Sequence, residues 1–107
     1  MMVKDKVVIV TGSGRGIGRD IAMQLALLGA RVVVNDAGVS ASGEGRDDGP
    51  AAQVVDEIRA AGGTALANTD SVSEWESANR IIRAAVDAFG TVDAIVNNAG
   101  ILRDRIF

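Results

Sequence analysis

Residues 7–18 read VVIVTGSGRGIG, and this stretch decides the fold. It begins with an apolar run, as in a strand that is buried on both faces of a parallel sheet. Glycine then stands at positions 12, 14, 16 and 18, directly before a helical pattern. Glycine permits a tight turn and lets an anion approach the backbone N–H groups, which attract phosphate at the start of a helix. The segment therefore predicts a strand, a glycine turn suited to a diphosphate, and a helix.

The rest of the chain alternates strand patterns with helical patterns. Apolar runs predict buried strands over 6–11, 31–35 and 92–97, and a shorter, weaker strand over 64–68. Residues 37–49 are rich in Gly, Ser and Asp and have no period, which predicts a surface loop. The chain therefore has four expected strands with a helix between each pair.

Local signals mark the ends of the three expected helices. The first ends at Gly29, and the second begins near Pro50 and ends at Gly62. The third begins at a capping box that opens with Ser73, and it ends at Gly90. Apolar residues at helical spacing predict the inward faces. In chain order these are Ile17, Ile21, Leu25 and Leu28; Val54, Val55 and Ile58; and Trp75, Ala78, Ile82, Ala85 and Phe89.

This alternation predicts a single α/β domain over 1–107. Strands joined by helices lie parallel, so we expect a Rossmann-type, three-layer, doubly wound parallel sheet in a partial, four-stranded version. Ligands of such sheets bind beyond the carboxyl ends of the strands. Polar residues stand at each of these ends: Thr11 and Gly12, Asp36, Asp70, and Asn97 and Asn98. The fold is expected to bring them to one edge.

The composition excludes several classes of function. Of the 107 residues, 48% are hydrophobic and 23% are charged, and the net charge of −3 provides no basic stripe for nucleic acid. The chain has neither Cys nor His, so no disulfide and no metal site are expected. No apolar run has the length of a signal peptide or a membrane span. We therefore expect a cytoplasmic protein that binds neither nucleic acid nor a membrane.

The glycine turn by itself allows several interpretations. The fingerprint Gly-x-Gly-x-x-Gly is not matched literally, because Ile17 occupies its last glycine position, and a P-loop fails because no Gly-Lys-Ser/Thr follows. A purely structural turn is a further alternative. The pattern that fits is Thr-Gly-x-x-x-Gly-x-Gly from Thr11 to Gly18, combined with Asn97-Asn98-Ala99-Gly100. Together they resemble the short-chain dehydrogenase/reductase family of nicotinamide-dependent oxidoreductases, and the chain resembles the cofactor-binding half of such an enzyme.

The resemblance implies a nicotinamide cofactor at the carboxyl edge of the sheet. It places five residues around the pyrophosphate and its riboses: Gly12, Arg15, Gly16, Ile17 and Gly18. It assigns Asp36 to the adenosine ribose, with an exposed turn aspartate as the alternative. A carboxylate there repels the 2′-phosphate of NADP and pairs with the 2′-hydroxyl of NAD, so we expect NAD. Arg15 favours NADP instead, because an arginine can bind that phosphate.

Two other strand ends receive roles from the resemblance. Asp70, Ser71 and Val72 are expected to border the adenine, although Asp70 also suits an ordinary helix cap. Asn98 is expected to contact the cofactor, and Asn97 to support the central strands.

A closer resemblance concerns the substrate. Six segments carry it: VVND at 33–36, the long glycine-containing loop at 37–49, VVDEI at 54–58, the glycine pair at 62–63, DSV at 70–72 and NNAGILRDR at 97–105. They resemble the (3R)-hydroxyacyl-CoA dehydrogenase module of multifunctional β-oxidation enzymes and related bacterial dehydrogenases. The resemblance implies a small-molecule substrate linked to coenzyme A.

Catalysis by this chain alone is not expected. The family reaction uses a Ser, a Tyr and a Lys four residues after the Tyr, whereas this chain has no Tyr and its lysines, Lys4 and Lys6, precede the glycine turn. No catalytic residue is therefore assigned, and a non-catalytic NAD-binding or interaction module is the alternative function. The fourth strand leaves an open apolar edge, which predicts self-association into a homo-oligomer.

Overall fold

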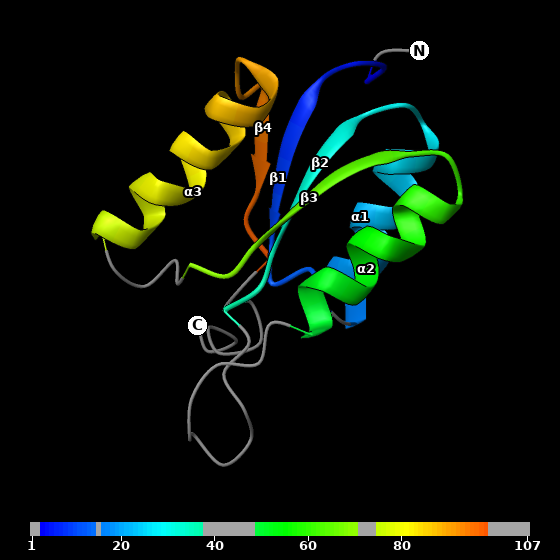
Figure 1. Ribbon diagram of the computed structural model, residues 1–107, viewed down its shortest axis with the longest axis horizontal. Coiled ribbons are helices and arrows are strands. Elements are labelled where there is room, and N and C mark those ends of the chain that lie inside the picture. Colours follow the sequence, from blue (N-terminus) through cyan, green and yellow to red (C-terminus); the bar gives the residue numbers. More distant parts are fainter. Residues whose placement is uncertain (1–2, 15, 38–48, 71–74, 99–107) are drawn as a thin grey trace, which may run out of the picture.

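A computed structural model describes residues 3–14, 16–37, 49–70 and 75–98. The strands and helices of this part alternate along the chain as β1 (Val7–Thr11), α1 (Gly16–Leu27), β2 (Arg31–Asn35), α2 (Gly49–Ala60), β3 (Thr64–Asn68), α3 (Trp75–Phe89) and β4 (Ala94–Val96). The strands are parallel and lie in the order β3-β2-β1-β4. Helices α1 and α2 cover one face of the sheet, and α3 covers the other (Figure 1). The predicted fold class is confirmed, with β1 one residue shorter than expected and β4 half as long as expected.

The centre of the sheet consists of β1 and β2. Every residue of β1 is buried, and its parallel register places Ile9 opposite the buried Val33. Val8 and Val10 belong to the core beneath α1 and α2, whereas Val7 and Ile9 belong to the core beneath α3. Because helices lie on both faces, an apolar side chain is buried whichever way it points, which explains the continuous apolar runs of the two strands.

Helix α1 packs on the sheet through small residues, and this corrects its predicted inward face. Its buried residues are Gly18, Ala22 and Ala26. Ile17 is 68% exposed and Leu28 is 40% exposed, while Ile21 and Leu25 are only partly buried at the margin of the core. The helix lies so close to the sheet that a Cβ atom on Gly18 would lie 2.2 Å from the carbonyl oxygen of Gly12. The large side chains of α1 therefore lie beside this close contact and not between the helix and the sheet.

The second helix is as predicted, because Val54, Val55 and Ile58 of α2 are all buried. The inward face of α3 is only partly as predicted, with Ala85 buried as expected. Its buried residues are Ser77, Ile81 and Ala85, which follow one another at intervals of four. Trp75 is 80% exposed and Ile82 is 41% exposed. Helix α3 packs over β1, β2 and β3, so the side of the helix that carries Ile82 faces outward beside β4. Of the predicted aromatic core residues, only Phe89 packs against the core.

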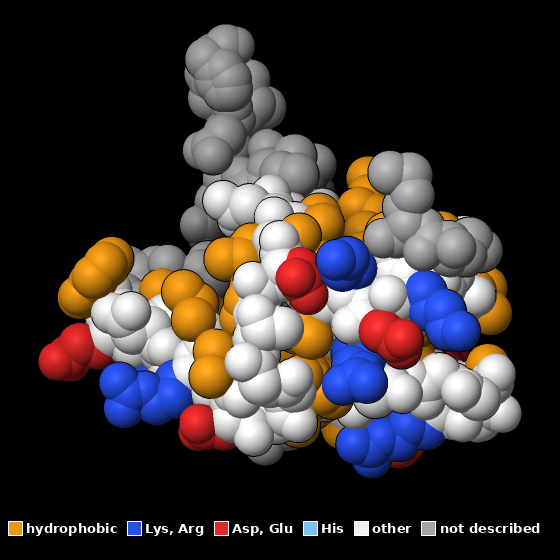
Figure 2. Space-filling model, turned by 90° about the horizontal axis from the view of Figure 1, so that it is seen from above, with side chains coloured by type: hydrophobic (Ala, Val, Ile, Leu, Met, Phe, Trp, Pro, Cys, Tyr) orange, Lys and Arg blue, Asp and Glu red, His pale blue; other side chains and the backbone are white. Residues whose placement is uncertain are grey.

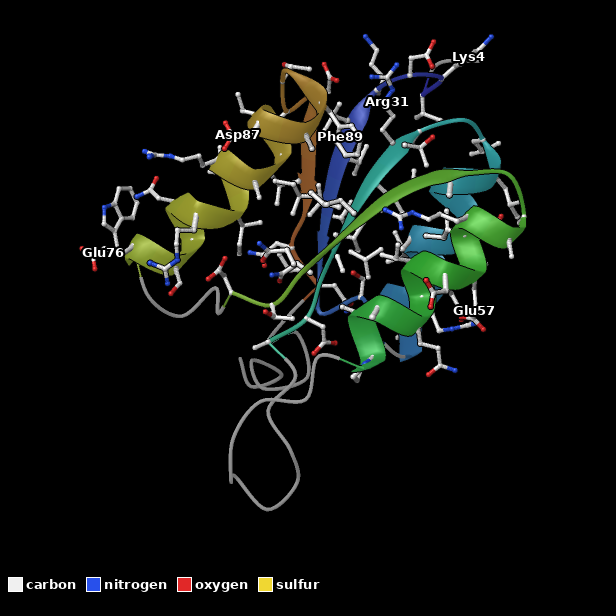
Figure 3. The ribbon with its side chains drawn as sticks, in the orientation of Figure 1. Lys4, Arg31, Glu57, Glu76, Asp87 and Phe89 are labelled. Carbon is white, nitrogen blue, oxygen red and sulfur yellow. The ribbon has the colours of Figure 1, made fainter. Side chains whose placement is uncertain are left out.

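Charged side chains lie on the outer surface. Figure 2 shows the end of the molecule opposite the carboxyl ends of the strands, where Lys and Arg side chains are interspersed with Asp and Glu side chains. One ion pair links α1 to α2: Arg19 Nη2 lies 2.8 Å from Glu57 Oε1, on the outer side of α2 (Figure 3). Within the described ranges, no helix combines the length and apolar character needed to cross a membrane.

Candidate functional site

The carboxyl ends of the four strands meet at one edge of the sheet, at the lower end of the ribbon in Figure 1. Direct hydrogen bonds join these strand ends. The Gly14 N–H donates to Asp36 Oδ2 over 3.0 Å, and the Asp36 N–H donates to the Asn68 carbonyl over 3.0 Å. The Asn98 N–H donates to Thr11 Oγ1 over 2.9 Å. Polar groups that the sequence scatters over almost the whole chain therefore form one connected edge.

Two structural reasons account for the four glycines of the turn. Gly12 and Gly16 both have φ of 63°, a conformation that residues with a Cβ rarely adopt. A Cβ on Gly14 would lie 2.6 Å from Asp36 Oδ2, and one on Gly18 would strike the Gly12 carbonyl. A Cβ on Gly16 would meet nothing within 4 Å. Glycine is thus favoured at all four positions, and the position of Gly16 opens outward.

Ser13 anchors the turn to the neighbouring strand. Its side chain is buried, and its hydroxyl donates to the Val10 carbonyl over 2.6 Å. Its backbone N–H donates to the Asn35 carbonyl over 2.9 Å. These bonds fix the first half of the turn against β1 and β2. Arg15 lies outside the described residues.

Asp36 is half-buried at the end of β2. The bond from the Gly14 N–H orients its carboxylate toward the turn. A carboxylate in this position is a strong acceptor for hydroxyl groups and a source of repulsion for a second anion. It can therefore distinguish a ribose hydroxyl from a ribose phosphate.

The end of β4 supports the turn from the other side. The side-chain amide of Asn98 donates to the Gly12 carbonyl over 3.2 Å, and the hydroxyl of Thr11 lies 3.3 Å from Asn97 Oδ1. Asn97 is exposed, whereas Asn98 is half-buried between β4 and the turn. Asn98 thus makes a supporting contact of the kind that the sequence analysis assigned to Asn97.

Behind Asp36, a polar network crosses from β2 to β3. Asn35 is 2% exposed, and its side-chain amide donates to Asn68 Oδ1 over 2.8 Å and to the Asp70 carbonyl over 2.9 Å. Asn68 in turn donates to Asp70 Oδ2 over 3.1 Å. Neither Asn35 nor Asn68 was predicted from the sequence as part of the site. They occupy matching register positions at the ends of adjacent strands, a pairing that only the strand alignment reveals.

Two predicted adenine neighbours, Ser71 and Val72, lie outside the described residues, as do Ser73 and the chain from 99 onward. Asp70 is described, and it completes the polar network with Asn35 and Asn68. Among the described residues, no group of His, Cys, Asp and Glu could hold a metal ion.

The site offers backbone amides, carboxylates and amide side chains. Such groups bind and orient a polar ligand, but exchange of a proton with an alcohol at neutral pH needs a group with a matched pKa. The chain has no Tyr, His or Cys, and Lys4 lies at the opposite end of the molecule, near the amino end of β1 (Figure 3). The described groups can therefore bind and orient a polar ligand.

A parallel sheet with a glycine turn at its carboxyl edge defines a Rossmann-type α/β fold, the class in which nucleotides bind at this edge. The model of the short chain dehydrogenase family matches residues 6–107, and the chain belongs to this family. It is 57% identical over 104 residues to peroxisomal multifunctional enzyme A of Dictyostelium discoideum, covering 97% of this chain and 23% of that protein. This agrees with the resemblance to multifunctional enzymes seen in the sequence.

Solved structures give the same result. A short chain dehydrogenase from Mycobacterium avium superposes with a TM-score of 0.84 at 52% identity, covering 94% of this chain and 36% of that one. A 7α-hydroxysteroid dehydrogenase complexed with NADH superposes with a TM-score of 0.78 at 35% identity, covering 89% and 34%. The family binds nicotinamide cofactors. The chain spans between 23% and 36% of the length of these three proteins.

The names of the relatives correct the predicted location. Besides the Dictyostelium enzyme, related multifunctional enzymes of Saccharomyces cerevisiae, Mus musculus and Drosophila melanogaster are named as peroxisomal. The prediction of a cytoplasmic protein is therefore wrong. The prediction relied on composition and hydropathy. These do not reveal a peroxisomal targeting signal, because such a signal is a short motif that a receptor recognises.

Proposed function

We propose that the chain binds NAD at the carboxyl edge of the sheet and serves as the cofactor-binding part of a dehydrogenase. The diphosphate lies over the glycine turn, and the adenosine ribose lies beside Asp36. The observation that carries this proposal is the hydrogen bond from the Gly14 N–H to the Asp36 carboxylate, 3.0 Å long. It sets an acceptor for hydroxyl groups directly beside backbone amides that suit an anion.

The residues present fit a dinucleotide. Because a Cβ on Gly16 would meet nothing within 4 Å, a phosphate can approach the backbone there without a clash. Helix α1 begins at Gly16, so its first N–H groups and its dipole favour a negative charge at the same place. Arg15, Ile17 and Gly18 are the proposed neighbours of the diphosphate and its riboses. Asn98 borders the same turn.

NAD is the proposed cofactor rather than NADP. The Asp36 carboxylate accepts hydrogen bonds from the ribose hydroxyls and repels a 2′-phosphate. Asp70, with Ser71 and Val72, is the proposed border of the adenine, because β3 lies next to β2 in the sheet.

The proposed reaction interconverts the hydroxyl and ketone forms of a 3-hydroxyacyl group linked to coenzyme A. Support comes from the relatives, one of which is the peroxisomal hydratase-dehydrogenase-epimerase of Saccharomyces cerevisiae. When bound, the nicotinamide ring accepts or supplies the hydride. The described residues hold and orient the cofactor, and the proton exchange needs groups that these residues do not provide.

Calorimetric titration with NAD, NADP and ATP-Mg tests the proposal. We expect NAD to bind about tenfold more tightly than NADP, a difference of about 1.4 kcal/mol, and ATP-Mg to bind less tightly than either. Asp36→Ala should abolish the preference for NAD. Asp87→Ala is the matched control, because Asp87 is exposed on α3, well away from the strand ends (Figure 3). Equal binding of NAD and NADP by the unmodified chain, or binding of neither, would contradict the proposal.

A further inference from the structure

The side chain of Arg80, on α3, binds the carboxylate of Asp70, which follows β3. Its Nε donates to Asp70 Oδ1 over 3.0 Å, and its Nη2 donates to Ser77 Oγ over 2.7 Å. Ser77 is buried and lies one turn earlier on α3, so it fixes the guanidinium on its own helix. The rigid fork of an arginine then fixes the direction of the bond to Asp70.

The other oxygen of Asp70 has a partner inside the sheet edge. Asn68 Nδ2 donates to Asp70 Oδ2 over 3.1 Å, and the Asp70 N–H donates to Asn68 Oδ1 over 2.9 Å. With one donor on each oxygen, the carboxylate has a single orientation. A carboxylate has about four acceptor positions, so it still accepts a bond from a ligand.

The position of Asp70 is set by the sheet. Neighbouring parallel strands lie about 4.8 Å apart, and in the order β1, β2, β3 they present the glycine turn, Asp36 and Asp70 in sequence. A nucleotide with its diphosphate at β1 and its ribose at β2 extends its base toward the end of β3. The base therefore approaches the carboxylate that Arg80 orients.

We infer that Arg80 is a positioning residue that makes the site selective for adenine. This inference rests on the proposed dinucleotide function. The exocyclic amine of adenine is a donor that the oriented carboxylate accepts, whereas hypoxanthine carries a carbonyl oxygen at the same place, which the carboxylate repels. Without Arg80, Asp70 Oδ1 loses its donor, and the carboxylate, then held only by the Asn68 amide, is less fixed in this orientation.

The test compares NAD with nicotinamide hypoxanthine dinucleotide by calorimetry, in the unmodified chain and in two variants. Arg80→Met should reduce the preference for NAD about fivefold, the effect of losing one oriented hydrogen bond. Arg83→Met is the matched control, since Arg83 is also exposed on α3 and forms no hydrogen bond or ion pair among the described residues; it should leave the preference unchanged.

The outcomes separate this inference from the proposed function. A purely structural role of Arg80 would weaken both dinucleotides equally or lower only the melting temperature, and either result would overturn the inference. The inference would also be overturned if Arg80→Met and the unmodified chain preferred NAD over the hypoxanthine dinucleotide to the same extent, or if neither showed a preference. In both cases the proposed binding of NAD would stand. Failure of the unmodified chain to bind either dinucleotide would reject the proposed function itself.

Discussion

The side-chain amide of Asn98 donates a hydrogen bond to the carbonyl oxygen of Gly12 over 3.2 Å. The two residues are 86 positions apart, and the bond joins the end of β4 to the turn after β1. The same carbonyl blocks any side chain at Gly18, so it stands between the strand end and the first turn of α1. The shape of the glycine turn therefore depends on a residue near the far end of the described chain.

Removing this bond should weaken both the fold and the site. We expect Asn98→Ala to lower the free energy of unfolding by about 1 kcal/mol, the usual net value of one hydrogen bond, and to weaken NAD binding about fivefold. Urea unfolding and calorimetry measure the two effects. Asn79→Ala is the control, because among the described residues the Asn79 amide bonds only to the Trp75 carbonyl of its own helix. Unchanged NAD binding in Asn98→Ala would contradict this role.

Glycine substitutions should separate stability from binding. Gly18→Ala drives a Cβ into the Gly12 carbonyl and should cost about 3 kcal/mol of unfolding free energy. Gly16→Ala meets no neighbour and should cost only about 1 kcal/mol, from its positive φ of 63°. Because its methyl group occupies the space proposed for the phosphate, it should still weaken NAD binding about tenfold or more.

Gly62 provides the matched control for Gly16. Its φ is 91°, and a Cβ there would meet nothing within 4 Å. It follows the C-terminal end of α2, away from the carboxyl ends of the strands. Gly62→Ala should lose a similar amount of stability and bind NAD normally. If both variants bind NAD equally well, the phosphate does not lie over Gly16.

The β4 edge should cause self-association. Among the described residues β4 pairs only with β1, and Ile95 on this edge is 51% exposed beside Ile82. Exposed apolar edges associate, so sedimentation velocity should show a mass that rises with concentration. Ile95→Lys should shift this association to higher concentration. Leu27→Lys, at an exposed position on α1, should not. A monomer at all concentrations would contradict the prediction.

The chain in isolation should bind cofactor without transferring hydride. It contains no Tyr, and its two lysines lie near the amino end of β1. We expect no formation of reduced nicotinamide, followed by its absorbance, when NAD and a 3-hydroxyacyl-CoA are added at neutral pH. A complete short chain dehydrogenase with its own substrate is the positive control. Measurable turnover by the 107-residue chain would refute the assignment of a purely binding role.

The alternation of strands and helices and the position of the site could be predicted because their signals are local, whereas the spatial order of the strands was not predicted. The apolar run before Thr11 and the glycines after it define a strand and a turn, and the alternation of strands and helices brings the strand ends together. Asp36 follows directly from its place at the end of the second strand. Each of these inferences needs only spacing along the chain.

The helix faces and the polar network could not be predicted in this way. Periodicity favours the large residues Ile17 and Ile82, but the close approach of α1 selects glycine and alanine, and the placement of α3 over β1 to β3 turns Ile82 outward. The partners of Asn35 lie at and just beyond the end of another strand, and Arg80 reaches Asp70 across ten positions. Such contacts depend on tertiary geometry, to which a single sequence gives no direct access.

The most direct test of the account is a titration of the isotopically labelled chain with NAD, followed by the backbone amide resonances in NMR. The central claim is that the amides of the glycine turn hold the diphosphate, so Gly16, Ile17 and Gly18 should show the largest shifts. The amide resonances of Gly29, Gly62 and Gly90, which also have positive φ but lie away from the glycine turn, should not shift. Binding that leaves the turn unshifted, or that shifts residues at the opposite end of the sheet instead, would contradict the account.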